Sequence, residues 1–198
     1  MFIKANRFEK IIKTAYKGSR LHVGNDGVNF LASGAGWALS MKEDLMSKEL
    51  KAVVIKYVGR MPDPEEYFLA LEEGDQTEVP GAFIGKVDTR DLPYAEATRL
   101  AVIREDELLN IFQAVTENRV FMVLAQLVDL IDESVIDTWD GELRITGPYM
   151  DVRNRQIIVQ NDRMQLRLFM TVPEDTETEL LDYLGKTDLN SYDEEEKA

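Results

Sequence analysis

The acidic side chains of this sequence cluster where they could bind a hard metal ion. They are Asp88, Asp91, Asp129, Asp132, Glu133, Asp137 and Asp140. Because Mg²⁺ needs only one or two carboxylates besides substrate phosphates, a metal-dependent, nuclease-like enzyme is one hypothesis. These acids lie, however, in turn-rich and strongly acidic sequence, where clusters arise by chance. The interpretation we favour therefore includes neither a metal nor a cofactor.

Other catalytic chemistry has little support. The single histidine, His22, falls on an expected strand without a nucleophile or acid at a recognisable spacing, which argues against a Ser–His–Asp site. The chain has no cysteine, so disulfides, thiolate metal sites and thiol nucleophiles are excluded. The segment GAGWAL lacks the Lys-Ser/Thr pair and the helix start of a phosphate-binding loop. We expect a protein that is not an enzyme and has no catalytic residues.

Basic side chains gather near the start of the chain. Residues 1–60 hold 11 bases and five acids, a net charge of +6, whereas the 198-residue chain as a whole carries −14. Such asymmetry indicates a surface that faces a polyanion on a body that repels anions. The alternative is that solvated helices simply carry lysine.

Two amphipathic helices are expected to position these bases. Apolar residues recur at helical spacing over 6–17, with Asn6 as the expected N-cap and Gly18 at the end. A second helix is expected over 47–59, capped by Ser47. The bases that fall away from the two apolar stripes are the candidate nucleic-acid-binding residues: Arg7, Lys10, Lys13, Lys17, Lys48, Lys51 and Lys56.

Strands are expected between and after these helices. The turns NDG (25–27) and GAG (34–36) separate three strands, and two more follow the second helix, giving an α-β-β-β-α-β-β order that ends near residue 87. In the second part, apolar spacing over 103–119 predicts a third helix, and 120–131 reads as a buried strand or a helix. Further strands are expected over 140–147, 155–162 and 163–173, then a helix over 174–186.

This order divides the chain into three parts. We predict a basic-helix α+β unit at 1–87, a second, acidic α+β unit at 88–186 and a disordered acidic tail at 187–198. The halves share an order of elements without residue-by-residue identity, so an internal duplication of architecture is a hypothesis.

The segment QLRLF at 165–169 has two interpretations. It resembles the short peptide by which bacterial replication proteins bind their sliding clamp. Its residues also alternate between apolar and polar within RMQLRLFMTVP, as a half-buried strand would. We favour the strand, because docking peptides generally need to be free and extended.

The first part of the chain resembles the sliding DNA clamps, the ring-shaped processivity factors of replicative polymerases. The resemblance is carried by RFEKIIKTA, GVNFLASGAGWALSMK, SKELKAVVIKYVGRMP and EYFLALEEGD within residues 2–73, with a looser echo over 102–172. It implies an α+β fold of two similar α-β-β-β-α units with antiparallel sheets. It also implies a cytoplasmic, acidic homo-oligomeric ring whose basic helices line a central hole.

We therefore expect a clamp-like protein that binds duplex DNA phosphates independently of sequence, with a polymerase or other replication protein as a further partner. The acidic second half departs from the clamp pattern, because Glu105, Asp106, Glu107 and Glu117 load its expected leading helix. The alternative is an acidic protein-interaction or regulatory module that does not bind nucleic acid, and a phage or mobile-element origin would suit the small size. No secretory signal or membrane span is visible, so we expect a cytoplasmic protein that makes no membrane contact.

Overall fold

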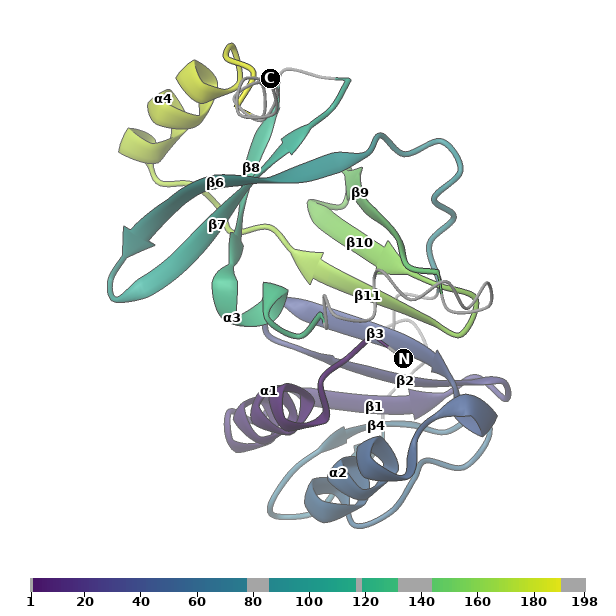
Figure 1. Ribbon diagram of the computed structural model, residues 1–198. Helices are drawn as coiled ribbons and strands as arrows, with labels where there is room; N and C mark the ends of the chain where they lie inside the picture. Colours follow the sequence, from purple (N-terminus) through teal and green to yellow (C-terminus); the bar gives the residue numbers. More distant parts are fainter. Residues whose placement is uncertain (1, 78–85, 117–118, 132–143, 190–198) are drawn as a thin grey trace.

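A computed structural model describes residues 2–77, 86–116, 119–131 and 144–189 (Figure 1). Within these ranges no helix is both long and apolar enough to span a bilayer. The fold is α+β with antiparallel sheets, as expected from the sequence.

The first half has the predicted order of elements. Helix α1 (Ala5–Lys17) is followed by strands β1 (Leu21–Asn25), β2 (Asn29–Gly34) and β3 (Trp37–Lys42). A short 3₁₀ turn, η1 (Glu43–Leu45), leads into α2 (Lys48–Val58), and β4 (Tyr67–Ala70) and β5 (Gln76–Thr77) follow. Asn6 is not the N-cap, because α1 begins at Ala5 with Lys4 in the cap position. Ser47 does cap α2, since its side chain accepts a hydrogen bond from the Leu50 backbone N–H.

The second half corrects one prediction: the described residues of 103–119 do not form a helix. They belong to a hairpin of β6 (Ala95–Arg104) and β7 (Glu107–Ala114), which β8 (Val120–Leu124) extends. Glu105 and Asp106 close the hairpin with φ of 46° and 67°, the left-handed conformation that two-residue hairpin turns require. The first strand of this hairpin begins at Ala95, before the stretch in which the helix was expected.

The remaining predictions for this half agree more closely with the structure. The apolar stretch 120–131 contains both a strand, β8, and a single helical turn, α3 (Ala125–Val128). Strands β9 (Thr146–Asp151), β10 (Gln156–Gln160) and β11 (Met164–Phe169) and helix α4 (Asp175–Leu184) follow. Of the strand expected at 140–147, residues 140–143 lie outside the described ranges, Arg144 and Ile145 are not in a strand, and only Thr146 and Gly147 fall in β9.

One eight-stranded sheet runs through both halves. Its order is β5-β4-β1-β2-β3-β11-β10-β9, and β3 pairs antiparallel with β11 from Trp37–Leu168 to Met41–Met164. The sheet thus joins two three-stranded meanders, β1-β2-β3 and β9-β10-β11, each preceded by a helix, α1 or α3. This shared helix-and-meander order is the internal repetition in the architecture.

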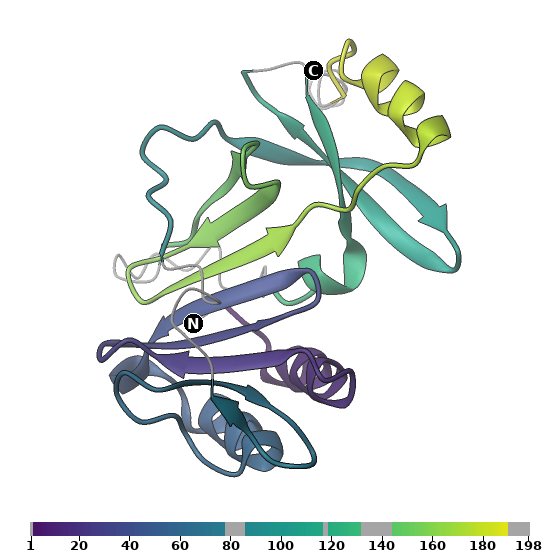
Figure 2. The same ribbon diagram turned by 180° about the vertical axis from the view of Figure 1, so that it is seen from behind.

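Helices α1, α2 and α3 cover one face of this sheet (Figures 1 and 2). Their apolar side chains and those of the strands form a single large core in which Phe8, Leu50, Leu127 and Leu166 are almost completely buried. The three-stranded sheet β6-β7-β8 lies between this core and α4. Its Phe112 and Val123 join the large core, whereas a second cluster around Leu109 packs under α4.

The QLRLF segment is β11, in the interior of the sheet, so the strand interpretation is confirmed and a free docking peptide is wrong. The strand is buried on both faces: Leu166 and Leu168 join the core, while Gln165 and Arg167 lie buried on the other face. Gln165 exchanges hydrogen bonds with both backbone groups of Val87, at 2.8 and 2.9 Å. Burial lowers the pKa of Arg167 to about 10.

The predicted boundaries at 87 and 186 stay predictions, although the sheet crosses the first of them. After the second, Gln113 hydrogen-bonds the Thr187 carbonyl and the Leu189 amide at 2.7 and 2.9 Å, which ties these residues to β7. Residues 190–198 of the predicted tail lie outside the described ranges.

Candidate nucleic-acid interface

The outer face of α1 carries three lysines. Lys10, Lys13 and Lys17 are spaced i, i+3 and i+7, which places them on one side of the helix, and all three are exposed. The opposite side is buried in the core through Phe8, Ile11, Ile12 and Ala15. Burial of this apolar side fixes the rotation of α1, so the lysines must face solvent.

Helix α2 presents two more lysines beside them. Lys48 and Lys56 are exposed, while Leu50, Val53, Val54 and Val58 are buried. The helix stops at Gly59, whose φ of 88° favours glycine.

The two helices lie side by side and are joined across their interface (Figure 1). The rings of Tyr16 and Tyr57 pack with their centroids 6.1 Å apart. Lys56 Nζ donates to Glu9 Oε1 at 2.5 Å, and the Tyr57 hydroxyl donates to the same oxygen at 3.2 Å. The hydrogen bonds from Lys56 and Tyr57 lower the pKa of Glu9, and Glu9 raises the pKa of Lys56. Glu9 therefore offsets one positive charge at the centre of the helix pair.

Two other predicted bases are held by acids at the flanks. Arg7 Nη2 lies 3.3 Å from Asp129 Oδ2 just after α3, and Lys51 Nζ lies 3.8 Å from Glu43 Oε1 in η1. Both pairs are partly exposed, so each contributes modestly to stability. Their main effect is to reduce the positive charge at the two edges of the helix pair.

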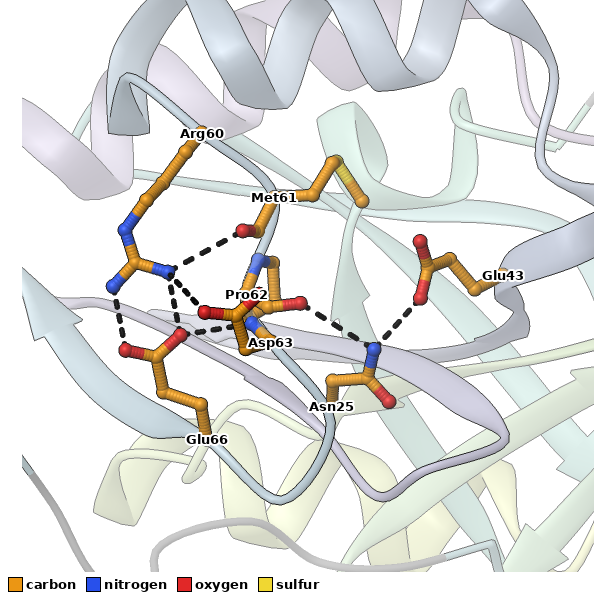
Figure 3. Close-up of polar contacts among 7 residues, drawn as sticks. All are labelled: Asn25, Glu43, Arg60, Met61, Pro62, Asp63 and Glu66. Atoms are coloured by element: carbon orange, nitrogen blue, oxygen red, sulfur yellow. Dashed lines mark hydrogen bonds and ion pairs between the residues drawn. The ribbon is translucent and has the colours of Figure 1, made fainter.

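The loop after α2 fixes that helix against the sheet (Figure 3). Arg60 donates to both carboxylate oxygens of Glu66 at 2.5 Å, a bidentate geometry that defines the loop conformation. Asn25, at the end of β1, donates to Glu43 at 2.7 Å and to the Pro62 carbonyl at 3.4 Å. The ion pair with Arg60 lowers the pKa of Glu66.

The structure thus brings the seven predicted bases onto two adjacent helices, but not as seven equal charges. Arg7, Lys51 and Lys56 each have a carboxylate partner, whereas Lys10, Lys13, Lys17 and Lys48 have none within 4 Å among the described residues. One further base was missed: Arg20 is exposed just beyond the end of α1. Its position three residues after Lys17 could have indicated it. It was left off the list of candidates because the helix was expected to end at Gly18.

The clustered acids that the structure describes, Asp88, Asp91 and Asp129, do not form a comparable site. Asp88 pairs with Arg90, and hydrogen bonds from this guanidinium lower the pKa of Asp88 to about 2. In the part of the chain that the structure describes, no group of three or more His, Asp or Glu side chains could hold a metal ion. Asp132, Glu133, Asp137 and Asp140 lie outside that part.

Comparisons with known proteins find similarity only among solved structures. No protein-family model and no curated protein matches the chain. The DNA polymerase III beta chain of Streptococcus pneumoniae matches with a TM-score of 0.37 and 11% identity, over 89% of this chain and 66% of that one. A putative DNA polymerase III beta subunit of Eubacterium rectale matches with a TM-score of 0.40 and 8% identity, over 90% and 67%.

A third such structure is the beta subunit of the Streptococcus pyogenes DNA polymerase, with a TM-score of 0.37, 8% identity and coverage of 88% and 63%. The chain therefore spans about two thirds of the length of these solved chains. All three are beta subunits of DNA polymerases, the class of sliding clamps that the sequence resembles. At this identity and TM-score, the similarity does not extend to DNA binding or assembly.

Proposed function

We propose that this chain is a non-enzymatic, clamp-like protein that binds the phosphates of duplex DNA through α1 and α2. The observation that carries the proposal is the row of exposed lysines on two adjacent helices: Lys10, Lys13, Lys17, Lys48 and Lys56. Of these, only Lys56 has a carboxylate within 4 Å among the described residues. The remaining surface belongs to a chain of net charge −14, which would confine a polyanion to this one face.

Binding of this kind does not read sequence. Lysine ammonium groups act as flexible point charges rather than as the planar forks that pair with base edges. Contacts to phosphates orient a protein on DNA and carry no direct sequence information. The partner we propose is therefore the duplex backbone.

Enclosing a duplex would require more than one copy. The second meander is preceded by α3, a single turn of four residues without a base, and α4 is acidic and lies at the opposite end of the molecule (Figure 1). The basic helices of one chain thus cover one side of a duplex at most. We include a homo-oligomer in the proposal, with a polymerase or other replication protein as a further partner.

One set of observations favours a second candidate function. Arg7, Lys51 and Lys56 are paired within the chain, so the basic face is already partly neutralised. A protein-interaction or regulatory module that does not bind nucleic acid would use the helix pair in this way.

Fluorescence anisotropy with a labelled 20-base-pair duplex separates the two functions. Five phosphate contacts predict a slope of log Kd against log salt of about 4.5, so affinity should fall about 500-fold between 50 and 200 mM salt. Two duplexes of unrelated sequence should bind equally. An absence of binding at 50 mM salt, or binding that salt does not weaken, rules out the proposal in favour of the interaction module.

The mass in solution tests assembly. Light scattering should give a multiple of the 22.6 kDa chain mass without the duplex, and such a multiple plus the mass of the duplex with it. A chain that stays monomeric in both conditions cannot close a ring, and encirclement would then be wrong even if DNA binds.

A further inference from the structure

The two flanks of α1 are covered unequally. On one side, α2 packs against it through the Tyr16–Tyr57 and Glu9–Lys56 contacts. On the other side, α3 is only one turn long, and its end meets the beginning of α1 through the Arg7–Asp129 pair. The C-terminal part of this flank of α1 borders a hollow of about 250 Å³, which lies between α1, α3 and the turn between β2 and β3.

The hollow has an apolar floor and a basic rim. Ile11, Ala15, Trp37 and Leu127 line it with apolar surface, and Lys10 and Arg20 stand at its edge. Both cations are exposed, and neither has a carboxylate within 4 Å in the described part of the chain.

The volume limits what this hollow can accept. Sites for whole small-molecule ligands usually measure about 300–1,000 Å³, and this one is smaller. A single aromatic or branched aliphatic side chain fits it better, as an anchor residue of a peptide does at a protein–protein interface.

The positive charge of the rim favours acidic residues on either side of that anchor residue. Lys10 and Arg20 would pair with carboxylates on either side of an inserted side chain, whereas a basic peptide would be repelled. We propose that this hollow is a docking site for an acidic peptide segment of a partner protein that inserts one apolar side chain. The site lies outside the proposed DNA contact except for Lys10, which belongs to both surfaces.

An extruded nucleobase fits the floor less well. Its ring nitrogens and exocyclic groups would lie mainly against Ile11, Ala15 and Leu127, where they would lose hydrogen bonds with water, while Thr14 and Gln126 are the uncharged polar side chains of the lining. The geometry therefore favours a peptide over a base.

The test uses the full chain and the fluorescein-labelled peptide Asp-Glu-Phe-Glu-Asp, followed by anisotropy. The matched peptide with Ala in place of Phe should bind at least tenfold more weakly. Ala35→Trp should fill the hollow from its exposed rim and weaken binding about tenfold, while Ala101→Trp, at an exposed position on β6, should leave it unchanged. Circular dichroism of both variants establishes that they are folded.

Three outcomes would overturn the proposal: equal binding of the Phe and Ala peptides, equal binding by Ala35→Trp and the unmodified chain, or no measurable binding. A charge-reversed pair, Lys10→Glu with Arg20→Glu, keeps the apolar floor and should weaken the Phe peptide at least fivefold at 50 mM salt. If single-stranded oligonucleotides compete with the peptide only when their bases are present, the occupant is a base and the peptide assignment is wrong. The unmodified chain binds the peptide whether or not it binds duplex DNA, so this test is separate from that of the proposed function.

Discussion

The two helix-and-meander halves of the eight-stranded sheet have the same order of elements but differ in the helix that precedes each meander. In the first half, a 13-residue helix, α1, crosses the sheet with lysines on its outer face. In the second, the corresponding helix, α3, has four residues, no base, and Asp129 at its end. The strands can therefore repeat while the helical surface does not, because α1 carries lysines whereas α3 carries no base.

This comparison also shows where the lysine-bearing surface of α1 ends. Asp129, at the end of α3, pairs with Arg7 of α1, so the second half neutralises the first along their border. Lys10, Lys13 and Lys17 project from the middle and end of α1, beyond the reach of this acid. The length of α3 thus decides both where the basic face ends and where the hollow beside α1 begins.

The largest expected effect concerns the junction of the two halves. Leu166 of β11 is fully buried and pairs with Leu39 of β3, so Leu166→Ala should lower the free energy of unfolding by about 2–5 kcal/mol. Because one core spans both halves, urea denaturation followed by fluorescence and circular dichroism should show a single transition for the unmodified chain and the variant. Two separate transitions would mean that the halves unfold independently.

Next in size is the effect of reversing the charge of the first half. The triple variant Lys10→Glu, Lys13→Glu, Lys17→Glu should weaken duplex binding about 100-fold or more at 50 mM salt and reduce the salt slope by about 3. The matched control reverses three exposed bases elsewhere, Lys86, Arg153 and Lys186, and so has the same net charge. Equal losses in the two variants would attribute binding to overall charge rather than to α1.

A smaller, opposite effect is expected at the interface of α1 and α2. Glu9→Gln removes the carboxylate that neutralises Lys56 and keeps a side chain that can hydrogen-bond to Tyr57. Duplex affinity should rise about threefold, as one more phosphate contact becomes favourable. The control is Glu179→Gln on α4, an exposed acid far from the basic face, which should leave affinity unchanged (Figure 1). Unchanged or weaker binding by Glu9→Gln would show that Lys56 does not contact DNA.

The smallest effect concerns the loop that holds α2. Arg60 lowers the pKa of Glu66 below 4.5, so the pair stabilises the folded state above that pH, and the contribution is lost as the pH falls through the folded pKa. Glu66→Gln should cost about 0.5–1 kcal/mol at pH 7, in the range of partly exposed ion pairs. Urea titrations should show a smaller loss of unfolding free energy for Glu66→Gln at pH 3 than at pH 7. The exposed control Glu72→Gln should show no loss at either pH.

The sequence was sufficient to predict the order of elements in the first half, because its local signals were consistent with one another. The apolar stripe of α1, the Ser47 cap of α2 and the NDG turn all act over a few residues, and tertiary packing did not override them. The same periodicity failed in β7, which is buried on both faces: Leu109 and Ile111 face α4, while Phe112 and Ala114 face the main core. A strand with two buried faces has a nearly continuous apolar pattern, which is easily mistaken for one side of a helix.

The candidate site was predicted as a list of bases but not as an electrostatic surface. The partners of Lys56 and Arg7 are 47 and 122 residues away in sequence, at Glu9 and Asp129, and only the folded chain brings them together. Amphipathic periodicity could show which lysines face outward. It could not show which of them the fold would neutralise.

The pairing of β3 with β11 has a consequence for any fragment of this protein. A polypeptide that stopped at residue 87 would keep both basic helices, yet the backbone from Trp37 to Met41 would have lost its hydrogen-bonding neighbour. An exposed row of amides and carbonyls beside buried apolar side chains recruits other chains. The half that carries the basic helices is therefore not a portable module, because its solubility depends on a strand contributed more than 120 residues later.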